Sequence, residues 1–443
     1  MSSELWFALS RVAASVGLLI VVLWGVSRLA KATALPAELG RKLVHISLGL
    51  YCLTFPWVFA AAWEVALMCG LSVAVFGLAR GTMRKGLGEG LHGVERVSFG
   101  EIFFAVSVAL LFWLADGHFI LSGTDAGATR GSLLYVLPIA ILTLCDAASA
   151  LVGVRYGKQT FQVEDGLKSV EGVVTFAVTA WLVAMIALLL LSDVGRSEVI
   201  LLGFIVAAFG ALLEGASWRG LDNLFIPLGL YFLLANLMHL GAVGLALVAG
   251  PFLLALLGLL YLTQHTNADR HFLATGATLF FCIGVFSGIE SVLTPALAVG
   301  AYLVCRRYLE AERPEHDALN LLVVVLAIAL LFFVVSNLAR LDTIFSFNLA
   351  FAALAAGVVA RFGANMPVLL GAIVVAALAM SVRTYWAEGR GTEAMLFTSI
   401  GSAIILLVAL AGWVFREKKL PRPWVSLGAL SAVSGMALLP LSP

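Results

Sequence analysis

Apolar stretches of about 20 residues alternate with short polar segments along almost the whole chain. As helices, stretches of this length cross the hydrocarbon core of a bilayer, so the pattern predicts an all-α, polytopic integral membrane protein with about 16 transmembrane helices. The expected spans lie near residues 6–27, 43–60, 63–79, 99–115, 132–152, 171–192, 198–213, 223–240, 244–262, 272–288, 291–305, 318–337, 345–360, 366–382, 395–415 and 424–441.

Composition agrees with this pattern. With 62% hydrophobic residues, 12% charged residues and a mean hydropathy of +1.05, the chain has too little polar surface to cover a soluble domain. The formal net charge of +1 gives no electrostatic reason to expect a nucleic-acid partner. Arg28 and Lys31 follow the first apolar stretch without a small-residue cleavage site, so we expect a retained span rather than a signal peptide. Without CxxC spacing, the five cysteines are typical of packing residues: Cys52, Cys69, Cys145, Cys282 and Cys305.

The basic residues predict the orientation. With the N-terminus outside, the inner segments hold most of the 27 Lys and Arg residues. Positive charge gathers on the cytosolic side of membrane proteins, so we expect a multi-pass protein of a bacterial inner (cytoplasmic) membrane in this orientation. The basic residues outside these inner segments are Arg11, Arg130, Arg196, Arg340, Arg383 and Arg390.

Four polar clusters fall on the predicted cytosolic side, at residues 38–45, 95–100, 146–172 and 213–227. The third is the densest, and its Asp146 follows the apolar residues of a span. Acids within a membrane are costly and usually functional, which favours catalysis over helix packing for Asp146. Lys168 precedes Ser169, a good helix N-cap, and a lysine there opposes the helix dipole unless an anion binds. We therefore predict Asp146, Lys168 and Asp222 as catalytic residues.

The carboxylates suggest a metal. Asp146, Glu214 and Asp222 would form an oxygen-ligand set suited to Mg²⁺. The alternative is that Glu214 and Asp222 only cap helices at a corner of the chain.

Further polar residues are candidates for contacts with a substrate or nucleotide: Arg41, Lys42, His45, Arg96, Lys158, Ser169, Glu171 and Asn223. Arg41 and Lys42 have an equally good interpretation as topology signals, and Lys158 as a lipid-surface anchor. His45 lies inside an apolar span and needs a hydrogen-bond partner there. The spacing of Gly153 and Gly157 fits helix packing as well as phosphate approach. GVRYGKQ is not a Walker A loop, because it follows a membrane helix and has Gln159 at the metal-binding position.

The motifs ELGRKLVHISLG, ERVSFGE, CDAASALVGVRYGK…KSVEG and LEGASWRGLDNLFIPL occur in this order across about residues 36–230. In this set the chain resembles the CTP-dependent lipid kinases (phytol, farnesol and dolichol kinases), which are related to phosphatidate cytidylyltransferases. The resemblance implies transfer of the terminal phosphate of CTP to a membrane isoprenoid alcohol, with Mg²⁺. Two departures are Cys145, where the family usually has Gly, and the single Asp222, where some relatives carry two acids.

The predicted organisation has two parts. Residues 1–235 form a membrane-embedded, CTP-dependent lipid-alcohol kinase domain, and residues 236–443 form an appended transmembrane helical bundle. The second part has no spaced polar set, and it would stabilise the enzyme, form a homo-oligomer or carry the lipid product.

Several functional alternatives remain open at this point. Asp222, Glu38 and His45 are all candidates for the general base of phosphoryl transfer. Rival activities are a cytidylyltransferase, a diacylglycerol kinase and a lipid transporter or flippase. Charge at one surface and in one half of the chain argues against a transporter, which usually binds near the midplane between repeats.

Overall fold

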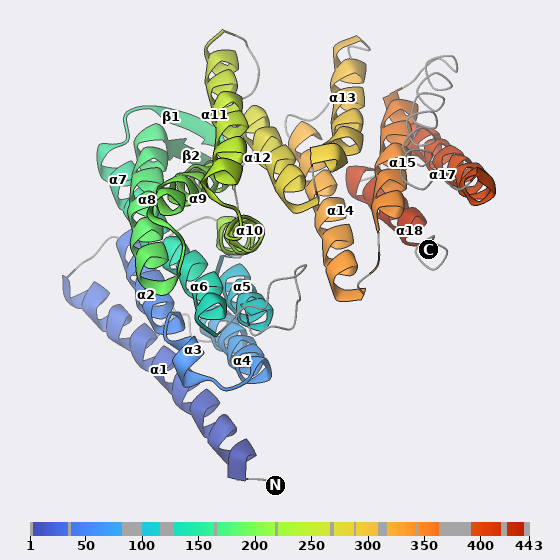
Figure 1. The fold of residues 1–443 in the computed structure, drawn as a ribbon. Helices are drawn as coiled ribbons and strands as arrows, with labels where there is room; N and C mark the ends of the chain where they lie inside the picture. Colours follow the sequence, from blue (N-terminus) through green and yellow to red (C-terminus); the bar gives the residue numbers. More distant parts are fainter. Residues whose placement is uncertain are drawn as a thin grey trace. The chain divides into compact units, whose positions relative to one another are not determined.

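The computed structural model describes residues 3–33, 37–81, 100–115, 128–163, 166–217, 220–265, 270–287, 289–308, 317–339, 341, 343–362, 391–417 and 423–437. Nearly all of these residues are helical, which confirms the predicted all-α class (Figure 1). The chain forms two compact units, Met1–Ala274 and Thr275–Pro443. The predicted boundary at residue 235 separates a kinase domain from an appended bundle by activity, whereas these units are defined by packing. That functional boundary stays a prediction.

The first unit holds the elements that build the site. They are α1 (Ser3–Thr33), α2 (Ala37–Cys52), α3 (Phe55–Val58), α4 (Ala62–Gly81), α5 (Gly100–Trp113), α6 (Ala128–Ala140), η2 (Ile141–Cys145), α7 (Asp146–Tyr156), β1 (Thr160–Val163), β2 (Gly166–Ser169), α8 (Val170–Leu191), α9 (Arg196–Ala216), α10 (Asp222–Leu237) and α11 (Ala242–His265). Helix α12 (Arg270–Ser287) contains the boundary between the units. Most helix bounds lie close to those of the expected spans, because the length of each apolar stretch determines where its helix begins and ends.

Helices α8 and α9 pack closely because small residues line their contact. On α8, the residues buried at four-residue spacing include Ala180 and Ala184. A Cβ added to Gly203 of α9 would lie 3.2 Å from Trp181 of α8, and one added to Gly210 would lie 3.0 Å from Phe176. Small residues at such contacts let two membrane helices approach closely. Here the start of α8, which follows Lys168, packs against the end of α9, which contains Glu214.

One expected span is a composite helix. Elements α6, η2 and α7 form one continuous stretch, Leu133–Tyr156, that is long and apolar enough to cross a membrane. Its middle, Ile141–Cys145, is π-helical, and Asp146 follows directly. The helix continues through Arg155, beyond the expected end of the span near residue 152.

A β-hairpin follows α7, in the segment between the expected spans near 132–152 and 171–192. Strands β1 and β2 pair in antiparallel register, with Phe161 opposite Lys168 and Thr160 opposite Ser169. The hairpin fixes Lys168 one residue before the N-cap of α8. Ser169 accepts a hydrogen bond from the Gly172 amide at 3.1 Å, which confirms the expected N-cap.

The second unit contains η3 (Ile289–Val292), α13 (Leu293–Tyr308), α14 (Asp317–Ala339), α15 (Ile344–Phe362), α17 (Gly391–Glu417) and α18 (Pro423–Met436). Helix α15 is its buried centre and packs against α13, α14, α17 and α18. Contact between α15 and α17 is very close, since a Cβ added to Gly412 would lie 2.4 Å from the Gly357 carbonyl.

The structure supports a membrane protein but not the full number of predicted spans. In the described part of the chain, five helices are long and apolar enough to cross a bilayer: Glu4–Leu29, Leu133–Tyr156, Val170–Leu191, Arg196–Ala216 and Ile344–Phe362. Shorter apolar helices occur at most other expected positions. The expected span at 43–60 is broken after Cys52, where a turn leads into the short α3 with Pro56 in its first turn. The expected span at 366–382 lies outside the described residues, and the total of about 16 stays a prediction.

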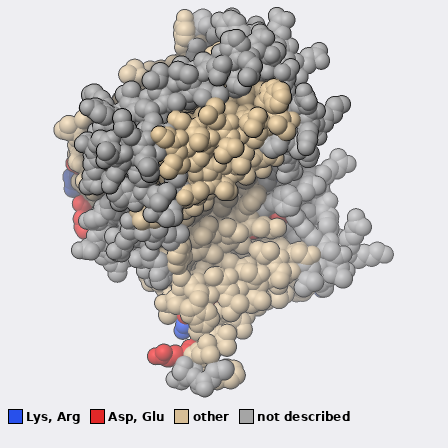
Figure 2. Space-filling model, turned by 90° about the vertical axis from the view of Figure 1, so that its right-hand side faces the viewer, with Lys and Arg blue, Asp and Glu red and all other residues tan. Residues whose placement is uncertain are grey.

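The described surface has the character expected of lipid contact. On the face in Figure 2, it consists mostly of residues other than Lys, Arg, Asp and Glu. Large apolar side chains such as Leu190, Leu247 and Trp57 are at least 70% exposed. Surfaces of this kind are unfavourable in water and favourable in a bilayer.

Candidate active site

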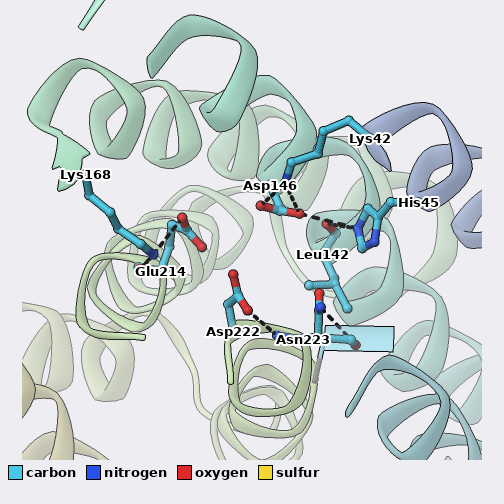
Figure 3. Close-up of polar contacts among 9 residues, drawn as sticks. Lys42, His45, Leu142, Asp146, Lys168, Glu214, Asp222 and Asn223 are labelled. Carbon is cyan, nitrogen blue, oxygen red and sulfur yellow. Dashed lines mark hydrogen bonds and ion pairs between the residues drawn. The ribbon is translucent and has the colours of Figure 1, made fainter. Parts of the chain in front are cut away.

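Three of the predicted polar clusters meet in the first unit, where α2, α7, α9 and α10 come together with strand β2 (Figure 3). The residues that meet are Lys42, His45, Asp146, Lys168, Glu214, Asp222 and Asn223. They come from positions up to about 180 residues apart in the chain, so the site depends on the packing of the whole unit.

Asp146 forms a buried ion pair with Lys42. Both carboxylate oxygens of Asp146 accept hydrogen bonds from Lys42 Nζ at 2.7 Å, and the two side chains are only 7% and 8% exposed. This pair explains how an acid and a base can both be buried here, because each compensates the charge of the other. The topology interpretation of Lys42 therefore does not account for its position.

His45 lies beside the same carboxylate. Its Nε2 is 3.2 Å from the Leu142 carbonyl oxygen and 3.5 Å from Asp146 Oδ2. An Nε2–H group donates to the carbonyl, which is the partner that a histidine in an apolar span requires. The Leu142 carbonyl belongs to the π-helical turn, so the irregular helix supplies the acceptor.

Lys168 pairs with Glu214 on the other side of the site. Its Nζ donates to Glu214 Oε1 at 2.9 Å and to the Glu214 carbonyl oxygen. Burial on its own lowers the pKa of Lys168, but the carboxylates of Glu214 and Asp222 raise it above the ordinary value. The side chain is therefore an ammonium ion at neutral pH.

Three carboxylates form a compact cluster between these two pairs. One oxygen from each of Asp146, Glu214 and Asp222 lies within 4.8 Å of the others. Asp146 and Glu214 are buried, and Asp222 is partly exposed. Glu214 Oε2 is buried and has no hydrogen-bond partner. A set of carboxylate oxygens with one oxygen unsatisfied fits a hard divalent cation such as Mg²⁺.

Asn223 connects this cluster with helix α5. Its Nδ2 donates to the Gly100 carbonyl oxygen at 3.0 Å, and its backbone amide donates to Asp222 Oδ1 at 3.0 Å. Its own Oδ1 is buried without a hydrogen-bond partner. The side chain is therefore held in place with one acceptor left open.

A pocket adjoins the cluster between α2, α4, α5 and α10. It contains about 490 Å³ of free space, counting the part open to its surroundings. Its lining residues are Arg41, Val44, His45, Leu48, Phe76, Gly100, Glu101, Phe104 and Asn223.

The remaining predicted contact residues are placed differently. Arg41 lines the pocket, whereas Lys158 is exposed after the end of α7. Glu171 accepts hydrogen bonds from the Gln159 amide at 3.2 and 3.3 Å, so it holds the segment after α7 to the start of α8. Arg96 and the side chain of Glu38 lie outside what the structure describes.

The glycines near Lys158 serve packing. A Cβ added to Gly153 or Gly157 would lie 2.9 or 2.8 Å from Ser169, and one added to Gly172 would lie 3.1 Å from the Ser149 carbonyl. Close contact between α7 and the start of α8 therefore accounts for these positions.

Sequence reasoning missed part of the pocket. Glu101 ends the motif ERVSFGE and lines the pocket, whereas the contact residue predicted in this motif is Arg96. Leu48, Phe76 and Phe104 also line it, and nothing in an apolar stretch distinguishes such residues from those that face lipid.

Together, the fold and the site define an all-α membrane protein in which two lysines and three carboxylates cluster beside a pocket with polar and apolar walls. Comparison with curated proteins agrees with this class. Over 229 residues, 52% of this chain and 91% of the relative, the sequence is 31% identical to a phytol kinase of Synechocystis sp.. The chain belongs to the phytol kinase family. No family model and no solved structure matches it.

Proposed function

We propose that this protein is a kinase that transfers the terminal phosphoryl group of a nucleoside triphosphate to the hydroxyl group of a membrane isoprenoid alcohol. The observation that carries the proposal is the cluster of Asp146, Glu214 and Asp222 with Lys42 and Lys168 paired to its two buried acids. Membership of the phytol kinase family supports an isoprenoid acceptor such as phytol, and the motif resemblance supports CTP as the donor.

The arrangement meets the two demands of phosphoryl transfer, which are positioning and stabilisation of negative charge. Asp146, Glu214 and Asp222 would hold Mg²⁺, which when bound neutralises charge on the phosphate oxygens. Lys168 stands at the N-terminus of α8, where the helix dipole also favours an anion. Its ammonium group stabilises the charge on the transferring phosphoryl group.

In the reaction, the alcohol oxygen forms a bond to the terminal phosphorus. The bond from that phosphorus to the bridging oxygen breaks, and the nucleoside diphosphate leaves. The hydroxyl proton passes to a base, for which Asp222 and His45 are the candidates among the described side chains. We place this chemistry at the cytosolic face of a bacterial inner membrane, where the nucleotide is available and the positive charge is predicted to lie.

The test is a product analysis with purified protein in lipid nanodiscs. CTP labelled in the γ-phosphate is incubated with Mg²⁺ and phytol, farnesol, dolichol or diacylglycerol, and the same panel is repeated with ATP, GTP and UTP. A labelled lipid together with CDP supports the proposal. Pyrophosphate and a cytidylyl lipid indicate a cytidylyltransferase instead. Label on diacylglycerol alone indicates a diacylglycerol kinase, and lipid movement without nucleotide turnover indicates a transporter.

A further inference from the structure

The pocket beside the carboxylate cluster has a polar end and an apolar end. Along α2, the residues Arg41, Val44, His45 and Leu48 follow helical spacing and lie on one face. His45 is at the polar end because its Nε2 is 3.5 Å from Asp146. Leu48 lies nearly one turn further along α2, where it packs against the buried cluster that contains Phe76.

The apolar end is continuous with the core of the first unit. Val44 and Leu48 pack against Leu19, Leu23 and Phe76, which come from α1 and α4. Phe104 of α5 closes another wall and contacts the His45 ring edge-on, at 5.3 Å between ring centres. A hydrocarbon chain in this part of the pocket would therefore meet mainly apolar side chains.

The polar end contains an open hydrogen-bond acceptor. Asn223 lines the pocket and is 92% buried, and its Oδ1 has no hydrogen-bond partner. Its Nδ2 is already held by the Gly100 carbonyl, so the amide cannot rotate to remove the open acceptor without losing that bond. Leaving a buried acceptor unsatisfied is costly, and a ligand hydroxyl would satisfy it.

Different side chains lie on the two sides of the carboxylate cluster. In Figure 3, Lys168 and Glu214 lie on one side of Asp222, and His45 and Asn223 lie toward the other. Lys168 stands at the helix N-terminus that favours phosphate, whereas His45 and Asn223 open into the apolar pocket. Phosphoryl transfer needs donor and acceptor on opposite sides of the transferred group.

We propose that this pocket is the acceptor site, and that it binds the hydroxyl end and the first isoprenoid units of the alcohol. The hydroxyl group donates to Asn223 Oδ1 in the bound state, and the chain runs past His45 and Phe104 toward Leu48 and Phe76. This inference rests on the proposed kinase function, and it deepens it by assigning the acceptor to the His45 side and the nucleotide to the Lys168 side.

Filling the apolar end tests the assignment. Leu48→Trp places a larger side chain between Val44 and Phe76, whereas Leu50→Trp on the same helix changes a residue that is 48% exposed. For Leu48→Trp we expect the KM for phytol to rise about tenfold or more, with a smaller rise for the shorter geraniol. The KM for the nucleotide should stay unchanged, and Leu50→Trp should match the unmodified protein in all three measurements.

A second experiment does not depend on turnover or on a substituted protein. A phytol analogue with a photoreactive diazirine at the far end of its chain is cross-linked to the unmodified protein in nanodiscs, with and without excess phytol. Label in peptides of α2 and α4 around Leu48 and Phe76 that phytol displaces supports the pocket. Displaceable label confined to other helices overturns it.

The outcomes separate the two proposals. If the protein phosphorylates phytol but Leu48→Trp and Leu50→Trp behave alike, the function stands and the acceptor site is wrong. If no alcohol is phosphorylated, the kinase proposal fails, and cross-linking still shows whether an isoprenoid alcohol binds in this pocket. If Leu48→Trp does not yield folded protein, the cross-linking result decides.

Discussion

The buried pair between Lys42 and Asp146 leads to a prediction about stability as well as activity. Asp146→Asn removes the charge of a proposed metal ligand with almost no change in volume. It also leaves the Lys42 ammonium without its partner, because both hydrogen bonds of 2.7 Å end on the lost carboxylate. We therefore expect Asp146→Asn to be inactive and also less stable than the unmodified protein.

The magnitude follows from the burial of the pair. Both side chains are at least 92% buried, so solvent cannot replace the missing partner. Breaking a buried ion pair from one side costs about 3–5 kcal/mol, whereas removing both charges together is nearly neutral. If 1 kcal/mol shifts Tm by about 2–4 °C, each single substitution, Asp146→Asn or Lys42→Met, should lower Tm by roughly 6–20 °C. The double variant should be clearly more stable than either single variant and close to the unmodified protein, so the two single losses should be far from additive.

Thermal unfolding of the four proteins in the same detergent measures the coupling, and the labelled-nucleotide assay measures turnover in parallel. The double variant should be stable yet inactive, which separates the loss of a metal ligand from the loss of the fold. Additive losses of Tm would refute the buried pair. Substantial turnover by the folded double variant would remove Asp146 from the mechanism.

Three further predictions use the same assays. Lys168→Ala should raise the KM for CTP or lower kcat, because the ammonium stands at the predicted phosphate position; an altered acceptor preference with unchanged CTP dependence would reverse the assignment of the two sides. Truncation after His265 should leave a first unit that inserts and keeps some activity, whereas a folded but inactive truncation would show that the second unit contributes to the site. Gly49→Ala should destabilise the protein by about 1–3 kcal/mol, because its Cβ would lie 2.0 Å from Thr143 Oγ1, whereas Gly77→Ala meets nothing within 4 Å and should not; equal Tm values for the two would contradict the close approach.

The sequence predicted local features well where a short physical rule applied. Apolar length gave helices such as Gly100–Trp113 and Val170–Leu191 to within about two residues. The cap at Ser169 and the need for a partner at His45 were also confirmed. These helices, the cap and the histidine partner depend only on neighbouring residues in the sequence or on the cost of burying a polar group.

Features that depend on packing between distant segments could not be predicted. Lys42 and Asp146 are 104 positions apart, and their contact depends on how α2 is rotated against α7. An apolar helix in a bilayer shows little polar periodicity, so its sequence does not reveal that rotation. Nothing in the sequence alone could therefore separate Lys42 as an ion-pair partner from Lys42 as a topology signal.

The β-hairpin after α7 has one local signal in the sequence. Polar and apolar residues alternate in β1, Thr160–Val163, with the period of a strand. Strand β2 has no such alternation, and its Gly166 pairs with Val163, so the position of Lys168 on a strand could not be predicted from its own neighbours.

The π-helical turn at Ile141–Cys145 has a consequence for comparing relatives by alignment. Such a turn accommodates one residue more than a regular helical turn while the flanking helices keep their facing, and turns of this kind recur at functional sites. In an ordinary helix one extra residue would rotate everything after it by about 100° and carry Asp146 away from Lys42. A relative that lacks one residue between Pro138 and Asp146 can therefore present the acid on the same face. A single-residue gap at this position of an alignment is compatible with an intact site.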